Sequence, residues 1–303
     1  MKQRYFAYGS NLNLHDWHRW CGANGFREGL LRPLFTALLP DRSLEFTRWS
    51  STRRSGVLDV APARGHLVEG VVFEVEDNGW DALDRKEGAP KAYRALDLEA
   101  LTVDGLAHPV RTFEVVPGRR ERFVEPDAQY LGVVRAGYRA FGVSATALDA
   151  AAVDGSAPSS LASLFAYGTL MRGESRSTVL ADLPGSLVAA GRVSGQLVDL
   201  GDFPGLRPDP SRKAWVVGEV HRPVDGLVLD LLDRIEGFPG FDLPGGLFRR
   251  RIVDLGSAED RLERAWTYVL VTDRAFPNVQ SGDWRAHRRT LDTGRVGPEQ
   301  SGY

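Results

Sequence analysis

The sequence predicts an α+β protein made of two tandem copies of one small domain, each a mixed β-sheet or partly closed β-barrel with flanking helices. Three landmarks predict the duplication. A strand that ends in Phe-Ala-Tyr-Gly and continues with Ser or Thr occurs at Tyr5–Ser10 and again at Leu164–Thr169. A valine-rich strand containing a glycine and a Leu-Asp-Arg-x-Glu-Gly segment then follow in each copy, in the same order. Self-similarity of this kind indicates homologous domains.

The spacing between equivalent residues supports this interpretation. The separations are 159, 148 and 149 positions, for the pairs Tyr8 and Tyr167, Gly70 and Gly218, and Glu87 and Glu236. The second copy is therefore about eleven residues shorter between the first landmark and the second, as expected when length differences fall in surface loops. We expect one domain over residues 1–153, a linker over 154–160 and a second domain over 161–303. The linker falls in a stretch rich in Ala, Ser, Gly and Pro that covers residues 144–163.

Hydrophobic periodicity predicts the elements of the first copy. Short apolar or alternating runs predict strands at Tyr5–Ala7, Leu44–Arg48, Gly56–Val60, Val68–Val75, Tyr93–Leu98 and Val110–Val115. Apolar residues at helical spacing predict helices at Leu14–Cys21, Trp80–Lys86 and Asp127–Phe141. Many strands and few helices favour a mixed sheet with its helices on one side.

Composition excludes several classes of protein. The chain has 303 residues, of which 43% are hydrophobic and 26% charged, which is enough apolar sequence for two buried cores. A net charge of −2 argues against nucleic acid or an anionic membrane as a partner. Cys21 is the only cysteine and the sequence shows neither a signal peptide nor a long apolar span, so we expect a cytoplasmic protein. A monomer is the simplest expectation, because two domains already share one chain.

The turn after the first strand of each copy carries the first chemical indication. A strand that passes through Gly9 or Gly168 into a helical turn leaves backbone N–H groups pointing the same way, which suits a carboxylate or an oxyanion. A purely structural turn would explain one such segment, but its repetition at the same place in both copies favours a function.

The second indication is a repeated glutamate. Glu87 and Glu236 each end a helical stretch, just before a glycine and after Asp-Arg-x. Helix ends do not require glutamate at this point, so its repetition is more than a solvated helix end would predict. A buried glutamate can serve as an acid and a base.

These residues resemble the γ-glutamylcyclotransferase-like, or AIG2-like, family over nearly the full length of both halves. The first half is similar to the γ-glutamylcyclotransferase branch, through Asn11-Leu12, Tyr93-Arg94 and Gln129-Tyr130-Leu131. The second is similar to the γ-glutamylamine cyclotransferase branch, through Thr169-Leu170-Met171, Phe248-Arg249-Arg250 and Ser281–Arg285. The resemblance implies a small mixed barrel with flanking helices, a pocket formed at the Tyr-Gly-Ser/Thr turn, a glutamate as acid/base, and no cofactor.

A γ-glutamyl amide can cyclise by attack of its own α-amine on the γ-carbonyl, releasing 5-oxoproline and an amine or amino acid. Folding the substrate for this ring closure is mainly a matter of orientation. We expect Glu87 and Glu236 to transfer the protons. The expected substrate-binding residues are Tyr8, Gly9, Ser10, Asn11, Leu12, Tyr93 and Tyr130 in the first copy and Tyr167, Gly168, Thr169, Leu170 and Met171 in the second.

The second copy departs from this pattern in two places. Phe248 stands where the first copy has Tyr93, and the segment after Glu236 is longer than its counterpart after Glu87. The substrate of the second half is therefore the less defined of the two. A small-molecule binding protein that has the pocket without turnover remains the alternative function, although a binding pocket has no need of an acid/base.

Two other clusters of residues carry weaker indications of function. His15, His18 and Cys21 occur at intervals of three on an expected helix, but no fourth ligand lies nearby in the sequence, so we expect no metal. The arginines near the C-terminus, Arg285, Arg288, Arg289 and Arg295, are more typical of a solvated helix face than of a nucleic-acid site.

Overall fold

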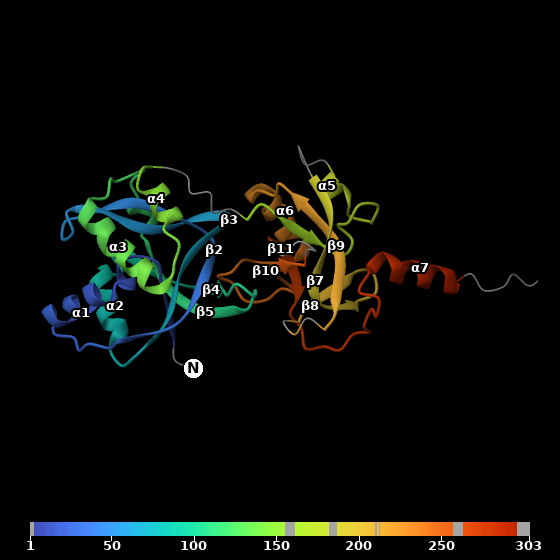
Figure 1. Cartoon of the computed structure of the whole chain (residues 1–303), viewed down its shortest axis with the longest axis horizontal. Helices are drawn as coiled ribbons and strands as arrows, with labels where there is room; N and C mark the ends of the chain where they lie inside the picture. The colour runs from blue at the N-terminus through green and yellow to red at the C-terminus, as the bar shows by residue number, and fades with distance from the viewer. Residues whose placement is uncertain are drawn as a thin grey trace, which may run out of the picture. The chain divides into compact units, whose positions relative to one another are not determined.

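The computed structural model describes residues 3–154, 161–181, 187–209, 211, 213–256 and 263–295. The chain divides into two compact units, one formed by Met1–Ser160 with Gly240–Pro244 and one by Leu161–Pro239 with Gly245–Tyr303 (Figure 1). Apart from Asp154, the expected linker at 154–160 lies outside the described residues. Across the described ranges, no helix is both long enough and apolar enough to cross a membrane.

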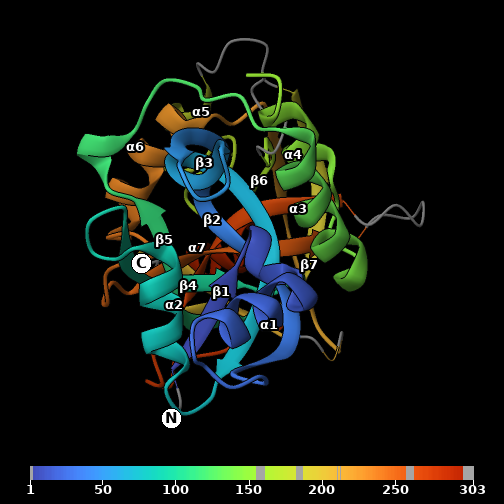
Figure 2. The same cartoon turned by 90° about the vertical axis from the view of Figure 1, so that its left-hand side faces the viewer.

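The first unit is a closed five-stranded barrel in the order β1-β3-β2-β4-β5. Neighbouring strands are antiparallel except β1 and β5, which are parallel. Figure 2 shows α1 and α2 below the barrel in that view and α3 and α4 to its right. The elements are β1 Arg4–Ala7, the 3₁₀ turn η1 Ser10–Leu12, α1 Leu14–Ala23, β2 Leu31–Ser50, β3 Ser55–Val75, α2 Gly79–Glu87, β4 Tyr93–Leu101, β5 Ala107–Val115, η2 Pro117–Arg119, α3 Ala128–Phe141 and α4 Thr146–Ala151.

Two long strands replace three of the short strands that the sequence predicted. Residues 44–48 are part of β2, and residues 56–60 and 68–75 are both part of β3, with pairing from Leu31 and Val75 to Ser50 and Ser55. The register shifts next to Pro33 and Pro40. Proline cannot donate to the ladder, and a bulge accommodates it. The prolines therefore hid the first half of β2 from the sequence pattern.

Helix α4 lies within the stretch 144–163 that resembled a linker by composition. Its Leu148 and Ala151 are buried in the core of the first unit. Alanine is the best helix former, so an Ala-rich segment with one well-placed leucine can form a packed helix. Composition alone does not separate these two outcomes.

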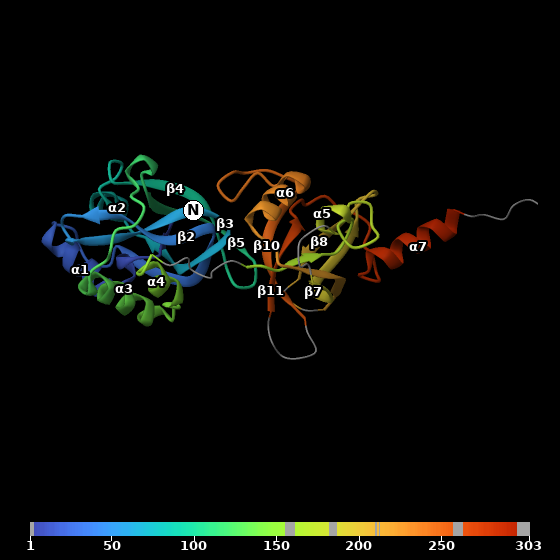
Figure 3. The same cartoon turned by 90° about the horizontal axis from the view of Figure 1, so that it is seen from above.

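The second unit is a six-stranded sheet in the order β10-β11-β6-β9-β7-β8, curled into a half-barrel. Strands β6 and β11 are parallel and the other neighbours antiparallel. Figure 3 shows α6 beside this sheet and α7 running out from it. The elements are β6 Leu164–Ala166, α5 Thr178–Ala181, β7 Leu187–Asp199, β8 Pro204–Pro208, β9 Trp215–Arg222, α6 Gly226–Glu236, β10 Phe248–Leu255, β11 Glu263–Leu270 and α7 Trp284–Arg295.

The start of α7 is fixed to its own sheet. Trp284 is buried, His287 lies 2.9 Å from Asp199 at the end of β7, and Arg285 donates to Glu219 on β9 at 2.8 Å. Part of the arginine cluster near the C-terminus therefore pairs within the unit.

The two units share one arrangement of strands. Strand β1 lies between β3 and a parallel β5 in the first, as β6 lies between β9 and a parallel β11 in the second. The predicted fold class, two tandem copies with a mixed sheet or barrel and flanking helices, is confirmed. The difference is closure: β2 pairs with β4 at Leu38 and Leu101 in the first unit, whereas its counterpart β7 pairs with β8.

The glycine of the valine-rich strand has a steric reason. A Cβ at Gly70 would lie 2.3 Å from the carbonyl oxygen of Ala7 and 2.6 Å from the ring of Phe6. A Cβ at Gly218 would lie 2.2 Å from the carbonyl oxygen of Ala166 and 2.7 Å from the ring of Phe165. The Phe-Ala dipeptide before each turn thus packs directly on a glycine of the neighbouring strand.

Candidate active sites

The tyrosine of each turn fixes the end of its strand. The Tyr8 hydroxyl donates to the carbonyl of Phe113 on β5 at 2.7 Å, and the Tyr167 hydroxyl donates to the carbonyl of Tyr268 on β11 at 2.7 Å. Both side chains are buried. Each hydrogen bond ties the turn to the parallel neighbour, so the tyrosine holds the turn in place.

The turn leaves part of its backbone available. Leu12 N–H donates to the Gly9 carbonyl at 3.0 Å and Met171 N–H donates to the Gly168 carbonyl at 2.9 Å, so these two groups close the turn. Among the described residues, the preceding three N–H groups of each turn have no acceptor. They belong to Gly9, Ser10 and Asn11 in the first unit and to Gly168, Thr169 and Leu170 in the second.

Each glutamate is the last residue of its helix. Glu87 ends α2 and Glu236 ends α6, and the glycines that follow adopt the left-handed conformation, with φ of 64° at Gly88 and 66° at Gly237. This conformation turns the chain away from the helix and suits glycine, which has no Cβ. Both glutamates are half-buried, and each lines a cavity of its own unit.

Glu87 is held by a neighbour from the turn. The Asn11 side chain donates to Glu87 Oε1 at 2.8 Å, and the same nitrogen lies 2.9 Å from the Tyr5 hydroxyl. Burial raises the pKa of Glu87 above its ordinary value, while Lys86, the Asn11 hydrogen bond, Arg48 and Arg53 act in the opposite direction. The carboxyl is therefore oriented and surrounded by positive charge.

Glu236 has a less polar environment. Leu170 occupies the position equivalent to Asn11, and no described side chain donates a hydrogen bond to the Glu236 carboxyl. Burial raises the pKa of Glu236 to about 7, against a lowering effect of Arg176. A carboxyl that titrates near neutral pH can exchange protons with a substrate in both directions.

The first cavity has a volume of about 760 Å³ and is lined by Glu87, Ser10, Tyr93 and Tyr130 among others. One peptide group of β3 positions both tyrosines. The Tyr93 hydroxyl donates to the Leu58 carbonyl at 2.7 Å, and the Tyr130 hydroxyl accepts from the Leu58 N–H at 3.4 Å. Tyr8, Gly9, Asn11 and Leu12 do not line this cavity; Leu12 is fully buried in the core.

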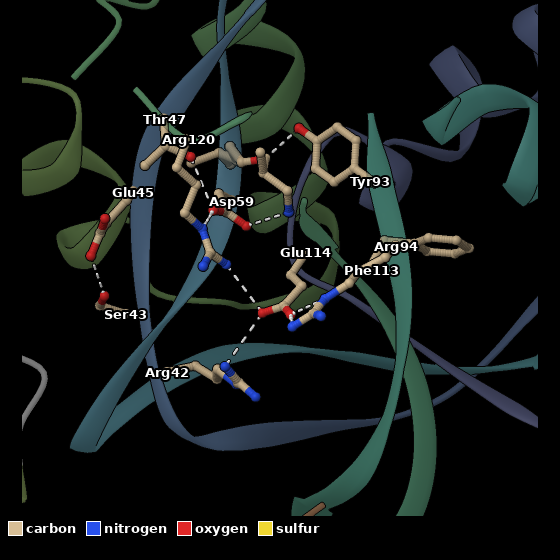
Figure 4. Close-up of polar contacts among 12 residues, drawn as sticks. Arg42, Ser43, Glu45, Thr47, Asp59, Tyr93, Arg94, Phe113, Glu114 and Arg120 are labelled. Atoms are coloured by element: carbon tan, nitrogen blue, oxygen red, sulfur yellow. Dashed lines mark hydrogen bonds and ion pairs between the residues drawn. The ribbon is translucent and has the colours of Figure 1, made fainter. Parts of the chain in front are cut away.

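A buried ionic network begins at Asp59, the residue after Leu58 on β3 (Figure 4). Asp59, Glu114 and Arg120 do not line the cavity. Asp59 accepts from Arg120 at 2.6 Å and from the Val115 N–H at 2.8 Å, and Arg120 also donates to Glu114 at 3.1 Å. Both carboxylates are fully buried. Because their acceptor oxygens are used by these partners, we interpret the network as support for the barrel wall that carries Tyr93.

The second cavity is smaller, about 250 Å³, and its wall is more apolar. Tyr167, Gly168, Thr169 and Leu170 line it with Glu236, whereas Met171 is buried and does not line it. Phe248 takes the place of Tyr93 and packs against Phe203, with 6.1 Å between ring centroids.

Some residues of these cavities were missed from the sequence. They are Asp16, Arg48, Arg53 and Lys86 in the first cavity and Arg176, Phe203, Pro204 and Tyr268 in the second. Lys86 carried a signal, because it stands next to Glu87 where the second copy has Ile235. The others come from separate elements with no repeated motif.

The helix that carries His15, His18 and Cys21 places the first and the last of these side chains in different surroundings. Cys21 is buried in the core, whereas His15 on the same helix is exposed. Within the described residues, no three His, Cys, Asp or Glu side chains gather closely enough to bind a metal ion.

Comparison with known proteins identifies the family. A family model described as "Gamma-glutamyl cyclotransferase, AIG2-like" matches residues 5–129 and, separately, residues 164–286. No curated protein matches the chain.

Solved structures with similar folds include a γ-glutamyl cyclotransferase, with 24% identity, 47% of this chain and 81% of that chain covered, and a TM-score of 0.41. An AIG2-like protein from Mus musculus has 26% identity over 39% of this chain and 86% of its own, with a TM-score of 0.32. YkqA from Bacillus subtilis is 14% identical and covers 99% of this chain and 100% of its own, with a TM-score of 0.29.

Proposed function

The chain belongs to the γ-glutamyl cyclotransferase, AIG2-like family, and from that premise we propose that it releases 5-oxoproline and a free amine or amino acid from γ-glutamyl amides. The observation that carries the proposal is made twice in the molecule. In each unit, a half-buried glutamate with a raised pKa lines the same cavity as part of a strand-end turn whose N–H groups are available, Ser10 in the first unit and Gly168, Thr169 and Leu170 in the second.

The reaction is balanced within the substrate. The neutral α-amine attacks the γ-carbonyl carbon, a new C–N bond closes the five-membered ring, and the bond to the leaving nitrogen breaks. The glutamate accepts one proton from the attacking nitrogen and returns one to the leaving nitrogen, so neither water nor a cofactor is consumed. The N–H groups of the turn stabilise the oxyanion of the intermediate or hold the substrate carboxylate.

The geometry supports different roles for the residues expected to bind substrate. Ser10, Tyr93 and Tyr130 contact the substrate directly in the first cavity, and Tyr167, Gly168, Thr169 and Leu170 in the second. Asn11 acts through Glu87, to which it donates, and Tyr8 acts through the position of its turn. Leu12 and Met171 close the turns through their N–H groups.

The test is an assay of the purified chain with a panel of γ-glutamyl amino acids and γ-glutamyl amines, in which 5-oxoproline is quantified. We expect 5-oxoproline and the free amine to form in equal amounts. Saturable binding of these compounds with no 5-oxoproline from any of them would contradict the proposal and support a binding protein in its place.

A further inference from the structure

A buried carboxylate lies one turn before Glu236 on α6. Asp233 is buried and stands three residues before Glu236, so both side chains lie on the same face of the helix. The hydroxyl of Tyr268 on β11 donates to Asp233 Oδ1 at 2.7 Å. Burial and the charge of Asp233 raise the pKa of Tyr268 well above its ordinary value, so the hydroxyl keeps its hydrogen and remains a donor. The hydrogen bond therefore joins the last turn of α6 to the sheet.

Arg250 on β10 contacts the chain on both sides of Glu236. Its side chain is fully buried, and it lies directly opposite Tyr268 in the register of β10 and β11. Its Nε lies 3.3 Å from Asp233 Oδ1. Its guanidinium lies over the ring of Phe238, with 5.6 Å to the centroid, and Phe238 is the second residue after the glutamate. One buried cation thus contacts the residue three positions before the glutamate and the residue two positions after it.

Tyr268 connects α6 to the turn at the second cavity. It lines the cavity together with Glu236, and its backbone carbonyl accepts the hydrogen bond from Tyr167 in the turn. The same residue thus contacts the turn through its main chain and α6 through its side chain. Because the turn and Glu236 both line this cavity, the hydrogen bond from Tyr268 to Asp233 helps to fix their separation.

The residues equivalent to Asp233 and Tyr268 in the first half cannot form this hydrogen bond. Asp84 corresponds to Asp233 in the repeated Leu-Asp-Arg-x-Glu-Gly segment, and it is exposed. Phe113 corresponds to Tyr268, since both carbonyls accept from the tyrosine of their turn, and phenylalanine has no hydroxyl group. The same sequence motif therefore places its aspartate in two different surroundings.

The two glutamates are held in different ways. Asn11 donates directly to the Glu87 carboxyl at 2.8 Å, whereas Leu170 at the equivalent position has no side-chain donor. A glutamate transfers protons efficiently only when its carboxyl is held within hydrogen-bond reach of the reacting atoms. In the second half, the polar contacts that can hold Glu236 act through the helix that carries it.

We propose that Asp233, Tyr268 and Arg250 form a positioning triad, which fixes the last turn of α6 and thereby holds the carboxyl of Glu236 at the turn. The triad takes the place of the direct hydrogen bond that Asn11 makes in the first half. The inference rests on the proposed function. The three residues act through Glu236 and transfer no proton to or from the substrate themselves.

The test removes the hydroxyl of Tyr268 alone. The full chain carries Glu87→Gln, so that only the second half turns over, and kcat and KM for γ-glutamyl-ethylamide and γ-glutamyl-alanine are measured with and without Tyr268→Phe. We expect kcat to fall by about tenfold or more with KM largely unchanged, because a displaced carboxyl transfers protons more slowly. A raised KM with unchanged kcat would mean that Tyr268 binds the substrate, and unchanged values of both would mean that its hydrogen bond is only structural. Either result would overturn the proposal.

A second variant tests whether the lost rate follows from the position of Glu236. Leu170→Asn supplies the donor that Asn11 provides in the first half, so in a chain that also carries Tyr268→Phe it should recover most of the lost kcat. No recovery would overturn the equivalence between the triad and Asn11. Asp84→Asn, in a chain carrying Glu236→Gln, is the matched control and should leave the kcat of the first half unchanged, because Asp84 is exposed.

Hydrogen exchange distinguishes failure of the triad from failure of the proposed function, because it needs no turnover. The Gly237 N–H donates to the Arg234 carbonyl and the Phe238 N–H to the Asp233 carbonyl, which closes the end of α6. If the triad fixes this end, Tyr268→Phe should speed the exchange of both amides by about tenfold and leave α2 unaffected. Unchanged exchange would overturn the triad even in an active enzyme. Faster exchange supports the triad even where no 5-oxoproline forms.

Discussion

The two halves share the backbone arrangement that positions the glutamate and differ in the side chains that surround the glutamate. Tyr8 and Tyr167 make the same hydrogen bond across the parallel strand pair at the same distance, 2.7 Å. Thr112 and Thr267 donate to the equivalent carbonyls of Phe6 and Phe165, at 2.8 and 3.0 Å. The position of the turn is thus reproduced by buried polar contacts in both halves.

The surroundings of the carboxyl group are not reproduced. Asn11, which donates to Glu87, corresponds to Leu170, and the nearby Lys86 and Tyr93 correspond to Ile235 and Phe248, so each of these polar residues is apolar in the second half. The comparison teaches that the fold specifies where the glutamate lies, whereas a few neighbouring residues set the polarity of its surroundings. Each prediction below tests one part of that division.

The largest expected effect is loss of proton transfer. Glu87→Gln and Glu236→Gln preserve shape but remove the acid/base, so each should lower the kcat of its own half by about 10²–10⁴-fold while ligand affinity is largely unchanged. The double variant should form no 5-oxoproline. Glu28→Gln and Asp202→Asn, both at exposed positions, serve as controls.

The outcome of the single variants decides how far the comparison extends. If one of them leaves total activity unaffected on every substrate, that half is a binding or structural copy. A double variant that still turns over at the wild-type rate would exclude both glutamates from catalysis.

The next effect concerns the hydrogen bond from Asn11. A donor to a carboxylate stabilises its charged form, so Asn11→Leu should raise the pKa of Glu87 further above its ordinary value. The carboxylate form of Glu87 would then appear only at higher pH. The rising limb of the pH profile of kcat/KM for the first half should therefore shift to higher pH. Leu170→Asn should move the limb of the second half downward from its wild-type position near pH 7. If the pH profile of kcat/KM is unchanged in both variants, the exchange of Asn and Leu does not determine the pKa of the glutamate.

The smallest expected effect is on stability. The folded-state pKa of Glu236 is about 7 against an ordinary value of 4.5. Below both pKa values the Glu236 side chain is protonated in the folded and in the unfolded state. As the pH rises from about 4.5 to 7, the side chain ionises first in the unfolded chain, so the folded state loses stability over that range. Between pH 5 and pH 8, the free energy of unfolding of Glu236→Gln should therefore rise relative to wild type by on the order of 2 kcal/mol, after allowance for partial exposure.

Urea denaturation of the full chain at the two pH values measures this difference. Asp202→Asn, which removes an exposed carboxylate, should show no comparable gain. Equal stability of Glu236→Gln and wild type at pH 8 would mean that the Glu236 carboxyl is better solvated than its surroundings suggest.

Most of the fold followed from patterns that are local in the chain. The strand before each turn, the helices α1, α2 and α3, and the duplication itself depend on periodicity and on repeated residues close in sequence. The sequence pattern failed where two local signals compete. Pro33 and Pro40 concealed the first half of β2, and the alanines of α4 resembled a linker.

The candidate sites were predictable to the extent that they repeat. The glutamate and the turn each occur once in both halves, and in each half the glutamate and part of the turn line a cavity. The grouping of Arg48, Arg53 and Lys86 in the first cavity could not be predicted, because the three residues come from separate segments of the chain. Their grouping is a property of tertiary structure, with no signature in any one segment.

The contact between Gly70 and the Phe6-Ala7 dipeptide affects how variants of this protein are interpreted. Gly70 lines neither described cavity, and any larger residue must displace the backbone just before Tyr8 and Gly9. Gly218 has the same relation to Tyr167 and Gly168. In a screen for loss of activity these glycines will score with the glutamates, although they have no chemistry to contribute. A substitution at such a position measures how far the turn can be displaced. The residues at which substitutions reduce activity will therefore include those that hold the turn in place as well as those that contact the substrate.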